Sequence, residues 1–163
     1  MRMSKVAALG EKTVRESEKV LKVLWVSKSK MLREEVRQLK VYAAKQGLKL
    51  ELDSYVGKVL SVEWLARKKI LADGYSVVIA VLPLSMTAHL IELGRQYGFE
   101  VWRPKVEILH YDWKIPCPEF DGARDLMTPS VNANGDATFA HKRFRYFERV
   151  LAVELSTEPI EVE

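Results

Sequence analysis

The chain contains few of the residues and patterns that mark several common protein classes. It has one cysteine, Cys117, which excludes an intramolecular disulfide and a zinc site built from several thiolates. No run approaches the ~18 to 20 apolar residues that a membrane-spanning helix needs. The N-terminus alternates charges where a signal peptide would be apolar. We therefore expect a cytoplasmic protein without a membrane partner.

Glycine-rich phosphate-binding motifs and side-chain amides are also scarce. Neither G-x-G-x-x-G nor G-x-x-x-x-G-K-[ST] occurs, which argues against a dinucleotide fingerprint or a P-loop. Only 2 Asn and 3 Gln stand beside 26 Lys plus Arg and 22 Asp plus Glu. Charged groups in place of thermolabile amides are typical of hyperthermophiles, so we expect a thermophilic, archaeal source. The net charge of +4 permits an anionic partner without requiring one.

The 163 residues are enough to bury one sizeable core and too few for two ordinary domains. We predict a single α/β domain over residues 20–155. Residues 1–19 are predicted to form a short helix or a frayed tail, and residues 156–163 an acidic tail.

Apolar runs alternate with amphipathic helical periods along the first two thirds of the chain. The predicted strands cover 20–27, 48–53, 77–81 and 99–102, and the predicted helices cover 31–47, 61–72 and 85–97. This alternation indicates parallel strands joined by right-handed crossovers. We predict a Rossmann-like three-layer sandwich with helices on both faces of a mostly parallel sheet of four or five strands, in the order 2-1-3-4. Strand 77–81 should be the least exposed.

The last third of the chain has a weaker pattern. Residues 106–111 have the composition of a further short strand, whereas residues 113–142 show no sustained period. A structureless segment of that length is either functional or partly disordered. Residues 143–155 are predicted to form a long extra strand at the C-terminus. An unpaired stretch of this strand would be a template for a second chain, which predicts a homodimer.

A ligand site is predicted where the first and third strands end. In the order 2-1-3-4 their loops meet at the point where the chain reverses direction across the sheet, and helix N-termini there favour anions. The residues predicted to bind the ligand are Ser27, Lys28, Ser29, Lys30, Ser85, Thr87, Arg103 and Lys105. The structural alternative is that Ser85 caps a helix, Ser27 or Ser29 caps another, and the lysines are solvated.

Other side chains able to carry chemistry are scattered. They are His89, His110, Asp112, Cys117, Asp121, Asp125 and His141. No pair has a recognised metal-ligand spacing such as H-x-x-x-H or C-x-x-C, and no base is identified for a Cys117 nucleophile. We therefore expect neither metal nor cofactor, and whether the protein is an enzyme stays open.

Three functions are compatible with these features. The first is binding of a phosphate-bearing ligand, a nucleotide or oligonucleotide, at the predicted loops. The second is a nucleic-acid-binding accessory role without catalysis, since basic residues lie near Trp102 and Trp113. The third is a dimeric structural or interaction module. The basic residues of the second, nucleic-acid-binding function are Arg103, Lys105, Arg143 and Arg145. The structural alternative is that these arginines pair with nearby glutamates.

Overall fold

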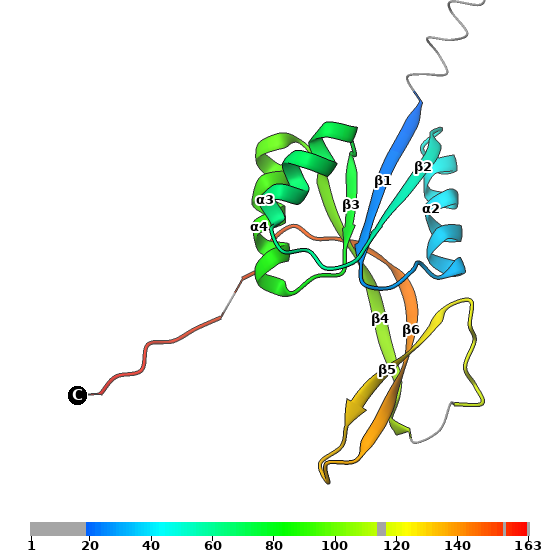
Figure 1. The fold of residues 1–163 in the computed structure, drawn as a ribbon, viewed down its shortest axis with the longest axis vertical. Coiled ribbons are helices and arrows are strands. Elements are labelled where there is room, and N and C mark those ends of the chain that lie inside the picture. The colour runs from blue at the N-terminus through cyan, green and yellow to red at the C-terminus, as the bar shows by residue number, and fades with distance from the viewer. Residues whose placement is uncertain (1–18, 114–116, 155, 163) are drawn as a thin grey trace, which may run out of the picture.

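The computed structural model describes residues 19–113, 117–154 and 156–162. Apart from Lys19, the predicted N-terminal helix or tail lies outside these residues. The described residues fold into one mixed sheet of six strands with three helices (Figure 1). In chain order the elements are β1 (Val20–Ser27), α2 (Arg33–Lys45), β2 (Lys49–Val56), α3 (Val62–Leu65) continued by the π-helical turn η1 (Ala66–Leu71), β3 (Val77–Ala80), α4 (Leu84–Tyr97), β4 (Glu100–Trp113), β5 (Asp125–Val131) and β6 (Ala137–Arg149).

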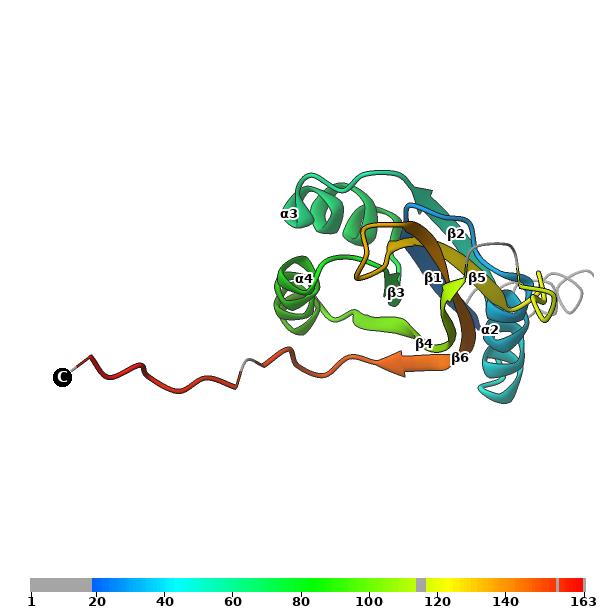
Figure 2. The same ribbon diagram turned by 90° about the horizontal axis from the view of Figure 1, so that it is seen from below.

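The strand order across the sheet is β2-β1-β3-β4-β6-β5. The pairings among the first four strands are parallel, so the predicted order 2-1-3-4 is confirmed for them. β6 pairs antiparallel with both β4 and β5. The sheet therefore has six strands rather than four or five, and it curls at its antiparallel side (Figure 2). A mostly parallel Rossmann-like sandwich is not confirmed, although the α/β class is.

Helices cover both faces of the parallel strands. α2 lies on one face, and α3, η1 and α4 lie on the other (Figures 1 and 2). Each face has its own apolar cluster, with Leu39 of α2 in one and Leu65 and Leu90 in the other. All four residues of β3 are buried because the strand contacts helices on both sides, whereas Val81, predicted as the last residue of this strand, lies beyond it and is 45% exposed.

Two helix ends have residues that are typical of caps. The Ser61 hydroxyl accepts a hydrogen bond from the Trp64 N–H at 3.2 Å, as an N-cap should. Gly98 ends α4 with a φ of 87°, a left-handed conformation that glycine adopts without strain. α4, however, begins after Pro83, so Ser85 lies inside its first turn and is not the cap. The structural alternative in which Ser85 caps this helix was therefore wrong.

The segment predicted to lack regular structure contains β5 and the start of β6. Its turn is closed by the Asn132 side chain, whose Oδ1 accepts hydrogen bonds from the N–H groups of Asn134 and Asp136. Gly135 has a φ of 83°, as a hairpin turn requires. The last strand spans Ala137–Arg149 rather than 143–155. β6 pairs with β4 along its length but with β5 only as far as Arg143, so among the described residues 144–149 have a strand on one side only, and the homodimer stays a prediction.

β4 and β6 continue beyond the carboxyl ends of the parallel strands. Together with β5 they form a projection that we name the arm, residues 105–113, 125–131 and 137–144 (Figure 1). Among the described residues, no helix is long and apolar enough to cross a bilayer.

Candidate metal centre

Two histidines lie side by side on the arm. His110 of β4 is directly opposite His141 of β6, and paired residues of adjacent strands project from the same face. Their rings are stacked, with centroids 5.4 Å apart and planes inclined by 23°. The loop between β4 and β5 covers this face, and its Phe120 ring lies 5.8 Å from that of His141. The same loop carries the buried thiol of Cys117.

These three residues form a potential metal site. One ligand atom from each of His110, Cys117 and His141 lies within 4.8 Å of the other two. A tetrahedral ion with bonds of about 2.0–2.3 Å needs ligand atoms roughly 3.3–3.8 Å apart, so the cluster needs only a small contraction to hold one. Imidazole and thiolate are ligands for zinc and copper.

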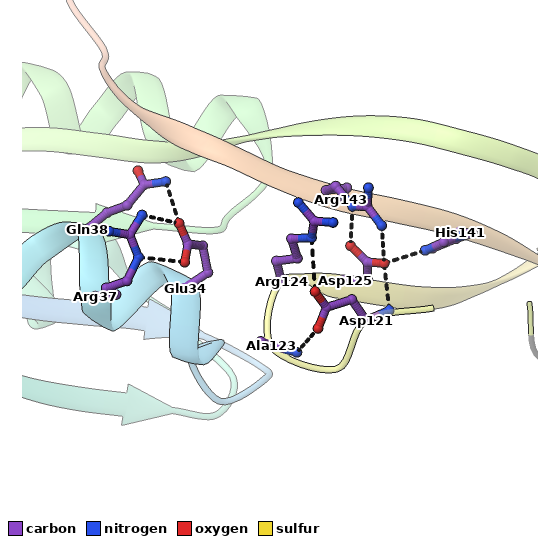
Figure 3. A network of polar contacts seen from close by, with 9 residues as sticks. All are labelled: Glu34, Arg37, Gln38, Asp121, Ala123, Arg124, Asp125, His141 and Arg143. Carbon is purple, nitrogen blue, oxygen red and sulfur yellow. Dashed lines mark hydrogen bonds and ion pairs between the residues drawn. The ribbon is translucent and has the colours of Figure 1, made fainter. Parts of the chain in front are cut away.

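Carboxylates fix the orientation of both rings. The Nε2 atom of His141 lies 2.7 Å from Oδ2 of Asp125 (Figure 3), and that of His110 lies 3.1 Å from Oε2 of Glu119. A metal-bound histidine commonly donates its other N–H to a carboxylate in this way. With its Nε2 atom engaged by Asp125, the His141 ring has Nδ1 left for an ion. In His141, which is fully buried, Nδ1 has no hydrogen-bond partner among the described residues.

Asp125 is held by several donors. Arg143 donates from Nε at 2.7 Å and from a terminal nitrogen at 3.0 Å, and the Asp121 N–H donates at 2.9 Å. Burial alone would raise the pKa of Asp125, but the hydrogen bonds from Arg143, the Asp121 N–H and His141 together lower it well below its usual range. Asp125 is therefore an anion that orients His141 by accepting a hydrogen bond from its ring N–H.

The loop that carries Cys117 is also fastened to the parallel half of the protein. The Ala123 carbonyl accepts a hydrogen bond of 2.9 Å from the Glu34 N–H at the start of α2. Asp121 accepts from the Ala123 N–H at 3.0 Å and pairs with Arg124 at 3.1 Å (Figure 3). The N-terminus of α2 thus positions the loop over the arm.

Of the residues predicted to bind an anion, some have buried hydroxyls that form hydrogen bonds within the protein, and the others are exposed. The Ser27 hydroxyl is buried and accepts from the Ser29 N–H at 3.2 Å. The buried Thr87 hydroxyl donates to the Pro83 carbonyl at 3.2 Å, within its own helix. The side chains at the remaining positions of these two loops are exposed: Lys28, Ser29, Lys30 and Ser85.

The structure brings the two loops to one edge of the sheet. β1 and β3 are adjacent and parallel, with Val26 opposite Ala80, so the loops leave from the same side. Arg103, one strand further on, is exposed and pairs with Glu148 at 2.9 Å. Lys105 is exposed and lies in the arm.

Sequence reasoning noted each potential metal ligand but did not place them together. The metal-ligand motifs considered place two ligands within a few residues of each other, whereas the ligands of this site come from two strands and a loop. The missed signal is the Asn134-Gly135 pair, which is typical of a hairpin turn. Recognising that hairpin would have placed His141 in a strand of the sheet rather than in an irregular segment.

Comparisons with known protein families, with curated proteins and with solved structures find no match. The cluster of His110, Cys117 and His141 combines imidazole and thiol ligands, two buried side chains and carboxylates that contact both rings.

Proposed function

We propose that the protein binds one transition-metal ion through His110, Cys117 and His141. The observation that carries this proposal is the state of His141. Its ring is fully buried, one nitrogen is taken by Asp125, and the other has no partner among the described residues. A buried polar atom without a partner costs ~1–3 kcal/mol. A metal ion beside Cys117 and His110 would supply that partner.

The ion would join parts of the chain that are far apart in sequence. β4, β6 and the loop from Cys117 each supply one ligand. Bound metal favours the folded state, because the unfolded chain does not hold its ligands together. Three protein ligands also leave a position for a fourth donor.

Native mass spectrometry after incubation with zinc(II) or copper(I) tests the proposal. Wild type should retain one ion per chain, and Cys117→Ser and His141→Asn should retain none. His89→Gln is the matched control, because His89 is exposed on α4 and distant in sequence from the site. A wild-type protein that retains neither ion would overturn the proposal.

A second candidate function, not exclusive of the first, is binding of a phosphate-bearing ligand at the carboxyl ends of β1 and β3. It is supported by the shared edge of the two loops and by the exposed Lys28, Lys30 and Ser85. A thermal-shift screen of nucleotides and cyclic oligonucleotides tests it. A ligand at a hundred times its dissociation constant adds about 2.7 kcal/mol to stability. Lys28→Glu should remove the shift, and an unshifted wild type would count against this function.

Nucleic-acid binding, a homodimer and a thermophilic source stay predictions. The arginines on which nucleic-acid binding depends are all paired with acidic side chains: Arg103 with Glu148, Arg143 with Asp125 and Arg145 with Glu107. Such pairing favours the structural alternative. A salt titration of binding to short DNA and RNA tests the first prediction, and light scattering at micromolar concentration tests the second.

A further inference from the structure

A methionine completes the row of residues that contains both histidines. On one side of His141 lies His110 of β4, and directly opposite on the other side lies Met127 of β5. Residues paired in this way project from the same face, with Cβ atoms roughly 4.5–5.5 Å apart. Asp125, two positions from Met127 on the same strand, demonstrates the shared face because it contacts the His141 ring. Met127 is partly buried there.

We infer that Met127 supplies a thioether as the fourth donor to the ion, so that the site prefers copper(I) to zinc(II). This inference rests on the proposed metal site. The unbranched Met side chain has three rotatable bonds and adapts its sulfur position to its surroundings. Two imidazoles, a thiolate and a thioether form a soft donor set, and thioethers select copper(I) whereas zinc takes nitrogen, thiolate or carboxylate ligands.

The charges around the cluster favour the same ion. The side chains of His141 and Asp125 are fully buried, and Asp125 is already neutralised by Arg143. Copper(I) bound to the Cys117 thiolate would leave no net charge in this environment. Zinc(II) would leave one more positive charge, which only the solvent-exposed Glu119 carboxylate beside His110 would offset, and burying such a charge is unfavourable.

The test compares wild type with Met127→Leu and with Met86→Leu as a matched control. Met86 is a partly buried methionine of α4 that packs against the apolar cluster on the face of the sheet covered by α3 and α4. Leucine conserves the volume of either methionine and removes only the sulfur. Copper(I) affinity is measured anaerobically by competition with a chromogenic chelator, and zinc(II) affinity by a parallel competition.

Met127→Leu should weaken copper(I) binding by about tenfold or more, as expected for the loss of one weak bond, and leave zinc(II) binding unchanged. Met86→Leu should change neither. X-ray absorption of the wild-type copper(I) form should show two sulfur neighbours, and the Met127→Leu form one.

Equal copper(I) affinity in wild type and Met127→Leu, or a single sulfur neighbour in wild type, would overturn the role of Met127. The three-ligand site would survive that result as long as Cys117→Ser still abolished binding. Absence of any bound ion in wild type would overturn both the site and the fourth ligand. The two failures are therefore distinguishable, and X-ray absorption decides the question even where a variant folds poorly.

Discussion

The Nε2 atom of His141 lies 2.7 Å from Oδ2 of Asp125, and neither side chain is accessible to solvent. Asp125 also accepts two hydrogen bonds from Arg143, so one carboxylate joins β5 to two positions on β6. Such a carboxylate serves two purposes. It neutralises a partly buried guanidinium, and it determines which nitrogen of His141 carries the proton.

Replacing Asp125 by Asn removes the negative charge and keeps the size of the side chain. We expect metal affinity to fall by about 10- to 100-fold, because the amide orients His141 less strongly. The free energy of unfolding should fall by roughly 3 kcal/mol, because Arg143 loses its partner. Asp136→Asn, an exposed change in the turn of the same arm, should alter neither quantity. Metal competition and urea denaturation measure the two effects, and equal affinity in both variants would contradict the role of Asp125.

Glu35 should make stability fall as the pH rises. Burial raises its pKa to about 7, and a hydrogen bond from the Leu32 N–H at 2.7 Å only partly offsets that increase. The folded protein therefore holds the proton more tightly than the unfolded chain, whose carboxyl has a pKa of about 4.5. The stability that this difference contributes is fully present below pH ~4.5 and is lost by pH ~7.

Glu35→Gln removes that ionisation while keeping an oxygen for the Leu32 N–H. The variant should be more stable than wild type above pH 7, by roughly 3 kcal/mol at most, and should lack the decline between pH 4.5 and 7. Glu92→Gln on the exposed face of α4 is the control. Denaturation curves at several pH values measure the effect, and parallel profiles for wild type and Glu35→Gln would refute it.

Val78→Asp should prevent folding. Val78 is fully buried in β3, and an unpaired carboxylate there costs several kcal/mol against a typical total stability of about 5 to 15. Val56→Asp introduces the same group at a position of β2 that is 50% exposed, and should be tolerated. Soluble expression and cooperative melting report the outcome. A Val78→Asp variant that melts cooperatively would show that the core accepts the charge.

Gly94→Ala should destabilise the protein although alanine favours helices. A Cβ atom at Gly94 would lie 2.6 Å from the Phe99 carbonyl oxygen, a backbone atom that cannot rotate away. The resulting strain, about 1–3 kcal/mol, should exceed the ~1 kcal/mol gain in helix propensity. Gly122→Ala, where the nearest atom is 3.8 Å away on the Phe120 ring, should change stability little. Thermal melting compares them, and a higher melting temperature for Gly94→Ala would contradict the clash.

The parallel half was predictable because each of its elements is encoded locally. The continuous apolar run of β3 and the helical period of α4 identify those elements without knowledge of their neighbours. The arm was not predictable in the same way. One face of β5 combines apolar and polar side chains, those of Leu126, Thr128 and Ser130. Strand formation there depends on pairing with β6. The part of β4 beyond Trp102 likewise forms a strand because it pairs with β6.

The candidate metal site follows the same division. His110 and His141 meet only because β4 and β6 are antiparallel in one particular register, which includes an irregularity between Ile108 and His110. A shift of one residue would move one histidine to the opposite face. The spacing of these residues along the chain does not reveal that register. The sequence-based expectation of no metal site therefore could not take this cluster into account.

The arm also differs from the rest of the sheet in what holds it together. Within the described residues, neither apolar cluster includes any residue between 103 and 146. Around His141 the arm is held by the hydrogen bond to Asp125 and by ring contacts with His110 and Phe120, and an ion at the proposed site would add to these contacts. Amide hydrogen exchange should therefore be slow in β1 and β3 whether or not metal is present. In β5 its rate should fall when zinc(II) or copper(I) is supplied.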